Sequence, residues 1–96
     1  MKNVNITPAT KKIADKAELY VEKDVFYEEL SDGNEIEIDC ICITEENSDL
    51  YVAYGISWDG SLYYITSPDF IEDLPAHINT SIELKNVVKY VAKFAL

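Results

Sequence analysis

The sequence has no arginine, and its eight lysines are absent from one long central stretch of the chain. Between Asp24 and Lys85 there is no lysine or arginine, whereas fourteen aspartates and glutamates lie there. Arginine is the residue that most often reads bases in nucleic-acid complexes, and the last predicted helix offers only the lysines Lys85, Lys89 and Lys93. We therefore expect no direct binding of nucleic acid.

Glycine, histidine and cysteine are also scarce, and this excludes several kinds of active site. Three glycines do not supply a glycine-rich phosphate-binding loop, and the single histidine, His77, has no partner nearby in the sequence. The acidic segment 45–49 lacks the spacing and the glycine of a calcium-binding loop, and two cysteines with one distant histidine do not complete a zinc site. We expect a protein that is not an enzyme and that uses no metal or other cofactor.

The two cysteines, Cys40 and Cys42, are two positions apart in a predicted strand, so they share one face of it. Neighbours of this kind are badly placed for a disulfide, and we expect two buried thiols in a reducing cytoplasm. Residues 1–5 have no apolar run typical of a signal peptide, and no apolar segment approaches the length of a membrane span. These features predict a cytoplasmic protein.

Length and net charge set the remaining limits. The 96 residues, 48% of them hydrophobic, are enough for a single domain that spans residues 1–96. The formal net charge of −10 repels nucleic acid and anionic membranes, and it attracts basic surfaces. We expect a basic protein as the partner; the sequence predicts no particular oligomeric state.

The first predicted element is a helix that begins at Thr7–Pro8, with the threonine as N-cap and the proline at the first helical position. It is expected to end near Lys23 or Asp24, because apolar residues continue at helical spacing through Ala9, Ile13, Ala17, Tyr20 and Val21. Residues 25–30 fit either a continuation of this helix or a first strand. We favour the strand, because the Asp32–Gly33 pair that follows is typical of a hairpin turn.

Acidic and apolar residues alternate along the strand predicted over residues 35–44. Successive side chains of a strand point to opposite faces, so Glu35, Glu37 and Asp39 share one face. We expect the other face to pack beneath the helices, with Ile36, Ile38, Cys40 and Cys42. A strand rises about 3.3 Å per residue, so the three carboxylates recur at about 6.6 Å, which is of the order of the separation between successive phosphates of a nucleic-acid strand.

Two further strands are predicted over residues 50–58 and 61–67, joined by a turn at Asp59–Gly60. One face of the 50–58 strand is apolar, and the other carries Tyr51 and small residues, with Tyr63 of the next strand expected among them. This second face is also the one on which we expect the acidic side chains.

Helices are predicted again toward the end of the chain. A short one is expected after Ser67–Pro68 and before Pro75, and the capping box Thr80–Glu83 starts the last one, whose buried stripe is Leu84, Val87, Val88, Val91 and Ala95. Together the elements predict an α+β fold, in which an antiparallel meander of three to four strands is packed on one face by N- and C-terminal helices.

The acidic sheet has two explanations. A charged strand face keeps a small protein soluble and protects the edges of its sheet. We favour a binding surface for a basic partner, because lysine and arginine are excluded over residues 25–84 and because the acids follow a regular strand spacing. Aromatic residues are enriched at interfaces, so the predicted partner-binding residues are Glu35, Glu37, Asp39, Glu45, Glu46, Asp49, Tyr51 and Tyr63.

In size, acidity, α+β class, lack of a catalytic motif and the acidic strand from Glu35 to Asp39, the chain resembles the small inhibitors that bacteriophages and mobile elements make against host defence proteins. Anti-CRISPR proteins and other DNA mimics belong to this group. The resemblance implies that the protein blocks a basic nucleic-acid-binding surface of a host defence nuclease complex, in the cytoplasm of the host cell. Two alternatives stay open: an immunity protein that neutralises a nuclease toxin, and a small adaptor or assembly protein whose charge serves solubility only.

Overall fold

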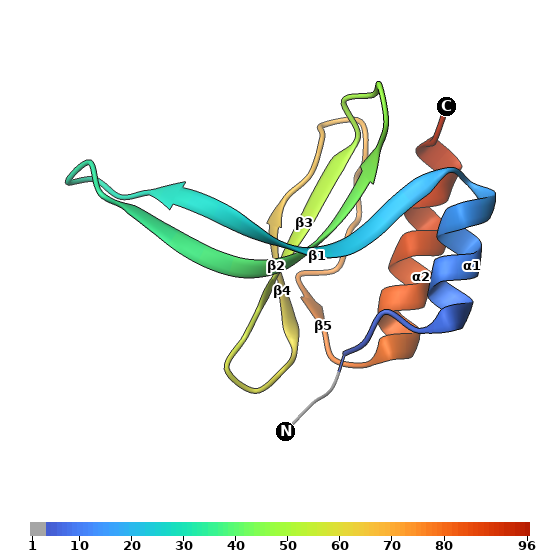
Figure 1. The fold of residues 1–96 in the computed structure, drawn as a ribbon, viewed down its shortest axis with the longest axis horizontal. Coiled ribbons are helices and arrows are strands. Elements are labelled where there is room, and N and C mark those ends of the chain that lie inside the picture. Colours follow the sequence, from blue (N-terminus) through green and yellow to red (C-terminus); the bar gives the residue numbers. More distant parts are fainter. Residues whose placement is uncertain (1–3) are drawn as a thin grey trace.

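The computed structural model describes residues 4–96; residues 1–3, which belong to the segment for which no signal peptide is expected, lie outside the described residues. Two helices, five strands and one 3-10 turn follow one another along the chain (Figure 1). Their bounds are α1 Pro8–Lys16, β1 Leu19–Glu29, β2 Glu35–Glu45, β3 Tyr51–Ile56, β4 Leu62–Thr66, β5 His77–Ile78, α2 Ser81–Val91 and η1 Ala92–Phe94.

The strands form one antiparallel sheet in the order β1-β2-β3-β4-β5. The predicted α+β class, with an antiparallel meander and a helix toward each end of the chain, is confirmed. The two-residue strand β5, which pairs with β4, was not predicted. It follows a segment rich in turn-forming residues and is too short to produce an alternating pattern.

Both helices pack on one face of the sheet, which we call the helix-covered face; the other is the open face (Figure 1). The predicted N-caps are confirmed: the Thr7 hydroxyl accepts the N–H of Thr10 at 3.2 Å, and the Thr80 hydroxyl accepts the N–H of Glu83 at 3.1 Å. The core between the helices and the sheet includes Ala14, Leu84, Val88 and Val91 from the helices and Leu19, Val21, Ile41, Ile43, Val52 and Tyr54 from the strands.

Helix α1 ends well before residues 23–24, so the expectation of a longer helix is wrong. Glu18 has a φ of 58°, a left-handed backbone conformation that ends the helix. Beyond it burial alternates as in a strand, since Leu19 and Val21 are buried and Tyr20 is exposed. The apolar residues of this stretch fit both periods, and packing against the sheet selects the strand.

The short helix predicted after Ser67–Pro68 does not form either. Residues 67–76 are irregular, and two tyrosine hydroxyls bind carbonyl groups of this segment. Tyr54 of β3 donates to the carbonyl of Pro75 at 2.7 Å, and Tyr90 of α2 donates to the carbonyl of Glu72 at 2.6 Å. The sheet and α2 therefore hold the segment through these hydrogen bonds. The N-cap and proline pattern of Ser67–Pro68 contains no information about such distant contacts.

The long hairpin of β1 and β2 extends beyond the rest of the sheet. The two strands pair along their whole length, from Leu19 with Glu45 to Glu29 with Glu35. β3 pairs only with residues 40–44 of β2, so residues 25–39 form a two-stranded ribbon, which we call the arm. The arm projects away from the helices (Figure 1), and the strand favoured over residues 25–30 is confirmed.

The turn at the tip of the arm forms at Asp32–Gly33, as predicted. Gly33 has a φ of 87°, and the N–H of Leu30 donates to the carbonyl of Asn34 at 2.6 Å. The Asp32 carboxylate accepts two hydrogen bonds from Asn34, one from the backbone N–H and one from the side-chain amide, each at 3.0 Å. These hydrogen bonds lower the pKa of Asp32 below its ordinary value.

The register of the hairpin corrects the assignment of its faces. Cross-strand partners share a face, and Ile41 and Ile43 of β2 pack beneath the helices. The acidic residues of the 35–39 segment continue this same row, whereas Cys40 and Cys42 lie on the open face, so the expectation that the cysteines pack beneath the helices is wrong. Over residues 40–43 the strand is apolar on both faces. The alternation of residue types therefore does not predict whether the cysteines or Ile41 and Ile43 pack beneath the helices.

Candidate functional site

One side of the arm combines four carboxylates with two apolar residues. On it the cross-strand pairs are Glu29 with Glu35, Tyr27 with Glu37, and Val25 with Asp39. All four carboxylates and Tyr27 are exposed to solvent. We call this surface the acidic face of the arm, and it consists of Val25, Tyr27, Glu29, Glu35, Glu37 and Asp39.

The charges of the acidic face are not neutralised by any residue of the described part of the chain. Among the described residues, none of its four carboxylates has an ion-pair or hydrogen-bond partner. Glu29 and Glu35 are directly opposite each other, an arrangement of like charges that destabilises a sheet. The nearest lysine along these strands, Lys23, pairs with Ile41 nearer the body of the sheet. A basic partner would thus meet four unpaired carboxylates.

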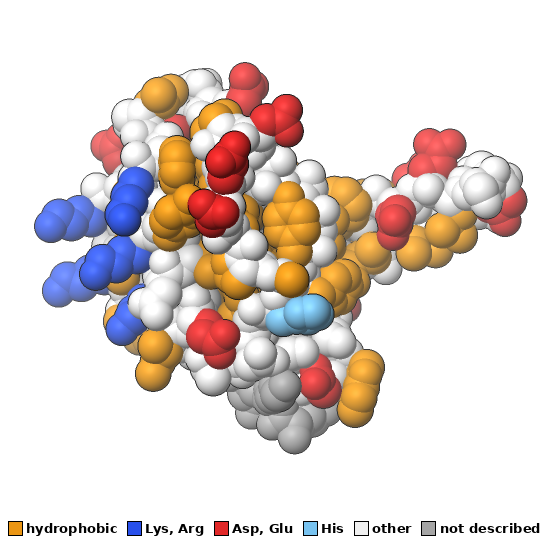
Figure 2. Space-filling model, turned by 180° about the vertical axis from the view of Figure 1, so that it is seen from behind, with side chains coloured by type: hydrophobic (Ala, Val, Ile, Leu, Met, Phe, Trp, Pro, Cys, Tyr) orange, Lys and Arg blue, Asp and Glu red, His pale blue; other side chains and the backbone are white. Residues whose placement is uncertain are grey.

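The opposite side of the arm is mainly apolar. Phe26 pairs with Ile38, and Ile36 pairs with Glu28. Phe26 packs against a small buried cluster on the open face, whereas Ile36 is exposed. Figure 2 shows hydrophobic side chains along the arm together with acidic side chains. The arm is therefore amphipathic.

The cysteines form the centre of that small cluster, together with Ala53. Their Sγ atoms are 3.3 Å apart, and the Sγ of Cys42 is 3.5 Å from the hydroxyl oxygen of Tyr51. Burial raises the pKa of Cys40 to about 12, and burial also raises the pKa of Tyr51. The prediction of two buried, unbridged thiols is confirmed, and burial disfavours the reactive thiolate form of Cys40.

Tyr51 and Tyr63 lie on the open face, so the expectation that they share a face with the acidic row is wrong. Tyr51 pairs with Thr44, which lies on the same face of β2 as Cys40 and Cys42. Tyr63 pairs with Gly55, which in turn pairs with Cys40. The ring of Tyr63 lies over Gly55 so closely that a Cβ there would overlap it. Tyr63 therefore lies near the foot of the arm, where Gly55 pairs with Cys40, whereas Tyr51 lies at the other end of β3, next to the β2–β3 turn.

Glu45 and Glu46 lie at the other end of β2. The Oε2 of Glu45 accepts the N–H of Leu96 at 2.9 Å, and its Oε1 is buried without a partner among residues 4–96. Glu46 accepts a hydrogen bond from the hydroxyl of Tyr20 at 3.2 Å, and its negative charge raises the pKa of that tyrosine. Both glutamates thus contact neighbouring parts of the same chain.

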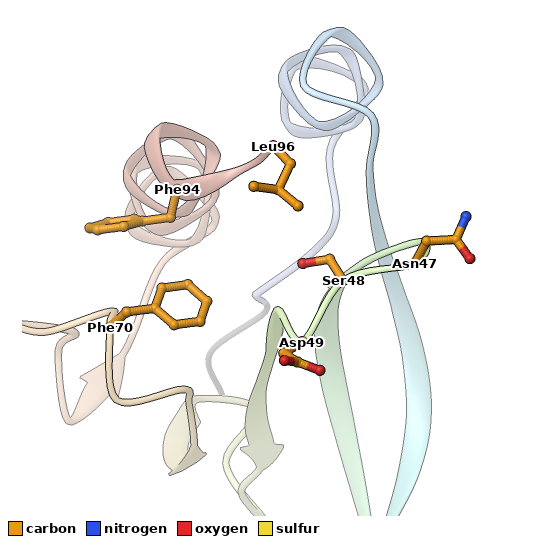
Figure 3. Close-up of a pocket in the computed structure, with 6 residues that line it drawn as sticks. All are labelled: Asn47, Ser48, Asp49, Phe70, Phe94 and Leu96. Carbon is orange, nitrogen blue, oxygen red and sulfur yellow. The ribbon is translucent and has the colours of Figure 1, made fainter.

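Asp49 borders a cavity of about 650 Å³ between the β2–β3 turn and the end of the described chain. Figure 3 shows the rings of Phe70 and Phe94 on one side of it and the turn with Asp49 on the other. The two ring centroids are 6.4 Å apart. The cavity combines phenyl rings, a leucine and polar turn residues, and these groups do not form a nucleophile–base set.

The eight predicted partner-binding residues therefore fall in three places: the arm, the β2–β3 turn and the open face. Glu35 and Glu45 are ten residues apart in one strand, about 33 Å along it. The structure brings together Glu35, Glu37 and Asp39, and it adds three residues that were not predicted, Val25, Tyr27 and Glu29.

The sequence contains only part of the signal for the residues on β1. A hairpin turn sets the register of its strands, so residues equally far from the centre of the loop lie opposite each other. A two-residue turn at Asp32–Gly33 would pair Glu29 with Ile36, whereas the loop of the structure is centred on Asp32 and pairs Glu29 with Glu35 and Tyr27 with Glu37. The Asp32–Gly33 pair therefore predicts that a hairpin forms, but it does not fix which residues of β1 share a face with Glu35.

Metal-ligating side chains are dispersed over the described part of the chain. Within it, no three His, Cys, Asp or Glu side chains lie close enough together to hold a metal ion. His77 is an exposed residue of β5, where it pairs with Tyr63. In residues 4–96, no helix has the length and apolar character needed to cross a membrane.

In the comparisons made, the chain matches no protein-family model, no curated protein sequence and no solved structure. Its function is therefore inferred from geometry and charge. The arm is the feature on which such an inference depends most directly, because one side of it gathers four exposed carboxylates and no basic residue.

Proposed function

We propose that this protein is an inhibitor whose acidic face of the arm binds a basic, nucleic-acid-binding surface of a host defence nuclease complex. The observation that carries the proposal is the projecting ribbon with four exposed and unpaired carboxylates. The carboxylates would take the places of phosphates and keep the nucleic acid from its binding surface. The resemblance of the chain in size and charge to DNA-mimic and anti-CRISPR inhibitors implies action of this kind in the host cytoplasm.

The spacing of the carboxylates supports the proposal. Glu35, Glu37 and Asp39 follow one strand at intervals of about 6.6 Å, and Glu29 lies on the neighbouring strand about 4.8 Å away. A row of lysines and arginines that holds successive phosphates would meet these carboxylates at comparable intervals. Tyr27 is exposed between them and offers an aromatic contact of the kind that is enriched at the centre of interfaces.

The electrostatics also favour a cationic partner. In the free protein Glu29 and Glu35 repel each other, and a lysine or arginine placed near both would replace that repulsion with attraction. Close charge pairs across an interface couple by about 1.5–7 kcal/mol. The arm extends beyond the helices (Figure 1), so it could enter a cleft that is too narrow for the rest of the protein.

Titration against a captured target tests the proposal. Tagged protein is used to isolate partners from lysate of a host that carries a nuclease defence system, and the captured complex is assayed for nuclease activity. Inhibition is expected to saturate near an equimolar ratio, and added nucleic acid is expected to compete. Loss of activity at far lower ratios, with a covalently altered target, would contradict a stoichiometric inhibitor. Capture of a nuclease toxin instead would favour an immunity protein.

A further inference from the structure

The lysines of the two helices gather around a groove on the side of the molecule away from the arm (Figure 2). The groove lies between α1 and α2, has a volume of about 450 Å³ and contains no acidic residue in its lining. We call it the lysine groove; it is lined by Ala9, Ile13 and Asn86 and by the four lysines Lys12, Lys16, Lys85 and Lys89.

The four lysines of the lysine groove have no acidic partner among the described residues. Although the chain contains eighteen aspartates and glutamates, none forms an ion pair with these lysines within residues 4–96. Nearby acidic positions on the helices, such as Asp15 and Glu83, do not line the groove. The groove thus presents four unpaired positive charges beside the apolar side chains of Ala9 and Ile13.

The acidic face of the arm is complementary to the groove in charge. On β1 the apolar Val25 and Tyr27 precede Glu29 in one row, and on β2 Glu35, Glu37 and Asp39 form the opposite row, so four unpaired carboxylates border two apolar side chains. The spacing also matches, because residues four apart in a helix are separated by a rise of about 6 Å and residues two apart in a strand by about 6.6 Å. Lys85 and Lys89 therefore repeat at nearly the interval of Glu35 and Glu37.

We propose that the acidic face of the arm of one copy docks into the lysine groove of a second copy, head to tail. The arm does not reach the groove of its own chain, because it projects away from the helices (Figure 1). A head-to-tail contact of this kind closes into a ring or continues as an open chain of copies. The inference goes beyond the proposed function and does not depend on it, since it concerns contacts between copies.

A second copy fits the groove better than a nucleic acid does. A polyanion approaching the groove meets the field of a protein with a net charge of −10, whereas an arm brings four negative charges that match four lysines in number. The two copies also repel each other overall. At about 0.1 M salt, charges more than about 10 Å apart are screened. The long axis of the molecule is 42 Å, so most of the repulsion between the two copies is screened. Carboxylates of the arm in direct contact with lysines of the groove would be closer than this distance and would still attract each other.

Self-association would close the arm to other partners. An arm seated in a lysine groove has its carboxylates covered, so a basic protein that binds the arm must first displace the second copy. Dilution or addition of such a basic protein would therefore release single copies with free arms.

Analytical ultracentrifugation with two charge-reversed variants tests the proposal. The arm variant carries Glu35→Lys, Glu37→Lys and Asp39→Lys; the groove variant carries Lys12→Glu, Lys85→Glu and Lys89→Glu. At about 0.1 M salt the wild type is expected to increase in average mass with concentration and to become monomeric at about 0.5 M salt. Each variant alone is expected to need a concentration at least about tenfold higher to associate. A mixture of the two variants restores arm–groove complementarity and is expected to associate like the wild type.

The design separates a specific contact from an effect of net charge. Each reversal changes the charge by two, so the arm variant has a net charge of −4 and the groove variant −16, starting from −10. If net charge alone governed association, the arm variant would associate more readily than the wild type. Circular dichroism of both variants confirms that each is folded before the masses are compared.

Three results would overturn the inference: a wild type that stays monomeric at the highest concentration at about 0.1 M salt, two variants that associate like the wild type, or a variant mixture that stays monomeric. Binding of a short single-stranded DNA to the groove of a monomeric wild type would assign the groove to a polyanion instead. The groove variant retains the acidic face of the arm, so its binding to a basic target tests the proposed function separately.

Discussion

The strands β1 and β2 pass through two regions of opposite character, a base where β2 also pairs with β3 and the arm beyond it. In the base, Ile41 is 1% exposed beneath the helices; in the arm, Ile36 is 41% exposed and Tyr27 is 59% exposed. The ladder of hydrogen bonds is continuous through both regions, but the apolar cover is not. Hydrogen bonding positions the side chains of the arm, whereas apolar packing stabilises the base.

The difference separates function from stability within one hairpin. A two-stranded hairpin is marginally stable in water by itself, so the arm depends on its tip turn and on its continuity with the base. Regions with few buried contacts open locally at low free-energy cost. We therefore expect changes in the arm to alter binding and local order, and changes in the base to alter the free energy of unfolding of the whole protein.

The largest expected effect is on binding by the arm. Reversal of Glu35, Glu37 and Asp39 to lysine is expected to abolish binding to the basic partner, because each change removes an attraction and adds a repulsion. The free energy of unfolding is expected to change by only about 0.5 kcal/mol per substitution, because all three side chains are exposed. Isothermal titration calorimetry and urea denaturation measure the two quantities.

A matched control keeps the same change of net charge away from the arm. Asp15→Lys, Glu18→Lys and Glu22→Lys change exposed residues near the junction of α1 and β1, and this variant is expected to bind nearly as the wild type does. Equal affinity of the arm variant and the control would mean that the acidic strand serves solubility only. The affinity of the wild-type protein for its basic partner is also expected to fall as salt is added, because salt screens the exposed carboxylates of the arm.

The sequence predicted the base less accurately than the arm, and the reason is physical. On the β2 side of the arm, acidic and apolar residues alternate strictly over residues 35–39, and the loop centred on Asp32 sets their pairing with β1. In the base β2 has apolar residues on both faces, so Cys40 and Ile41 were equally good candidates for the core beneath the helices. Only contacts with distant helices decide between them.

The candidate site was predictable in part for the same reason. Residues that share a strand face were grouped correctly, as with Glu35, Glu37 and Asp39. Grouping across strands failed for Tyr51 and Tyr63, because their face depends on the register between strands. The lysine groove depends on how two helices far apart in sequence pack together, and no local pattern contains that information.

Substitution of one isoleucine in each region tests the contrast directly. Ile41→Ala in the base is expected to lower the free energy of unfolding by about 2–5 kcal/mol, because it leaves a cavity in the core. Ile36→Ala in the arm is expected to lower it by less than about 1 kcal/mol, because that side chain is already partly in water. Urea denaturation measures both, and equal losses would show that the arm has a core of its own.

A pair of glycines sharpens the contrast at the level of single atoms. Gly55→Ala in the base is expected to lower the free energy of unfolding by about 1–3 kcal/mol, because the added Cβ overlaps the Tyr63 ring. Gly33→Ala at the tip of the arm meets nothing within 4 Å, and its cost of about 1–2 kcal/mol comes only from its positive φ. Thermal unfolding of double variants distinguishes the two: Tyr63→Ala should relieve the strain at Gly55 and not at Gly33. Independent, additive effects of Gly55→Ala and Tyr63→Ala would refute the overlap.

The smallest expected effect concerns the pH dependence of the arm tip. The hydrogen bonds from Asn34 lower the pKa of Asp32 below 3.8 in the folded turn, so the carboxylate stabilises the turn at pH values above 3.8. That stabilisation is lost as the pH falls through the lowered pKa, because the protonated side chain is a poorer acceptor. In nuclear magnetic resonance spectra, the amide signal of Asn34 should therefore shift in this acidic range while that of Ile41 in the base stays nearly constant. In the Asp32→Ala variant at neutral pH, the amide signal of Asn34 is expected at the position that it has in the wild type at acidic pH. If the Asn34 signal of this variant still shifted with pH, a group other than Asp32 would be responsible for the pH dependence of the turn.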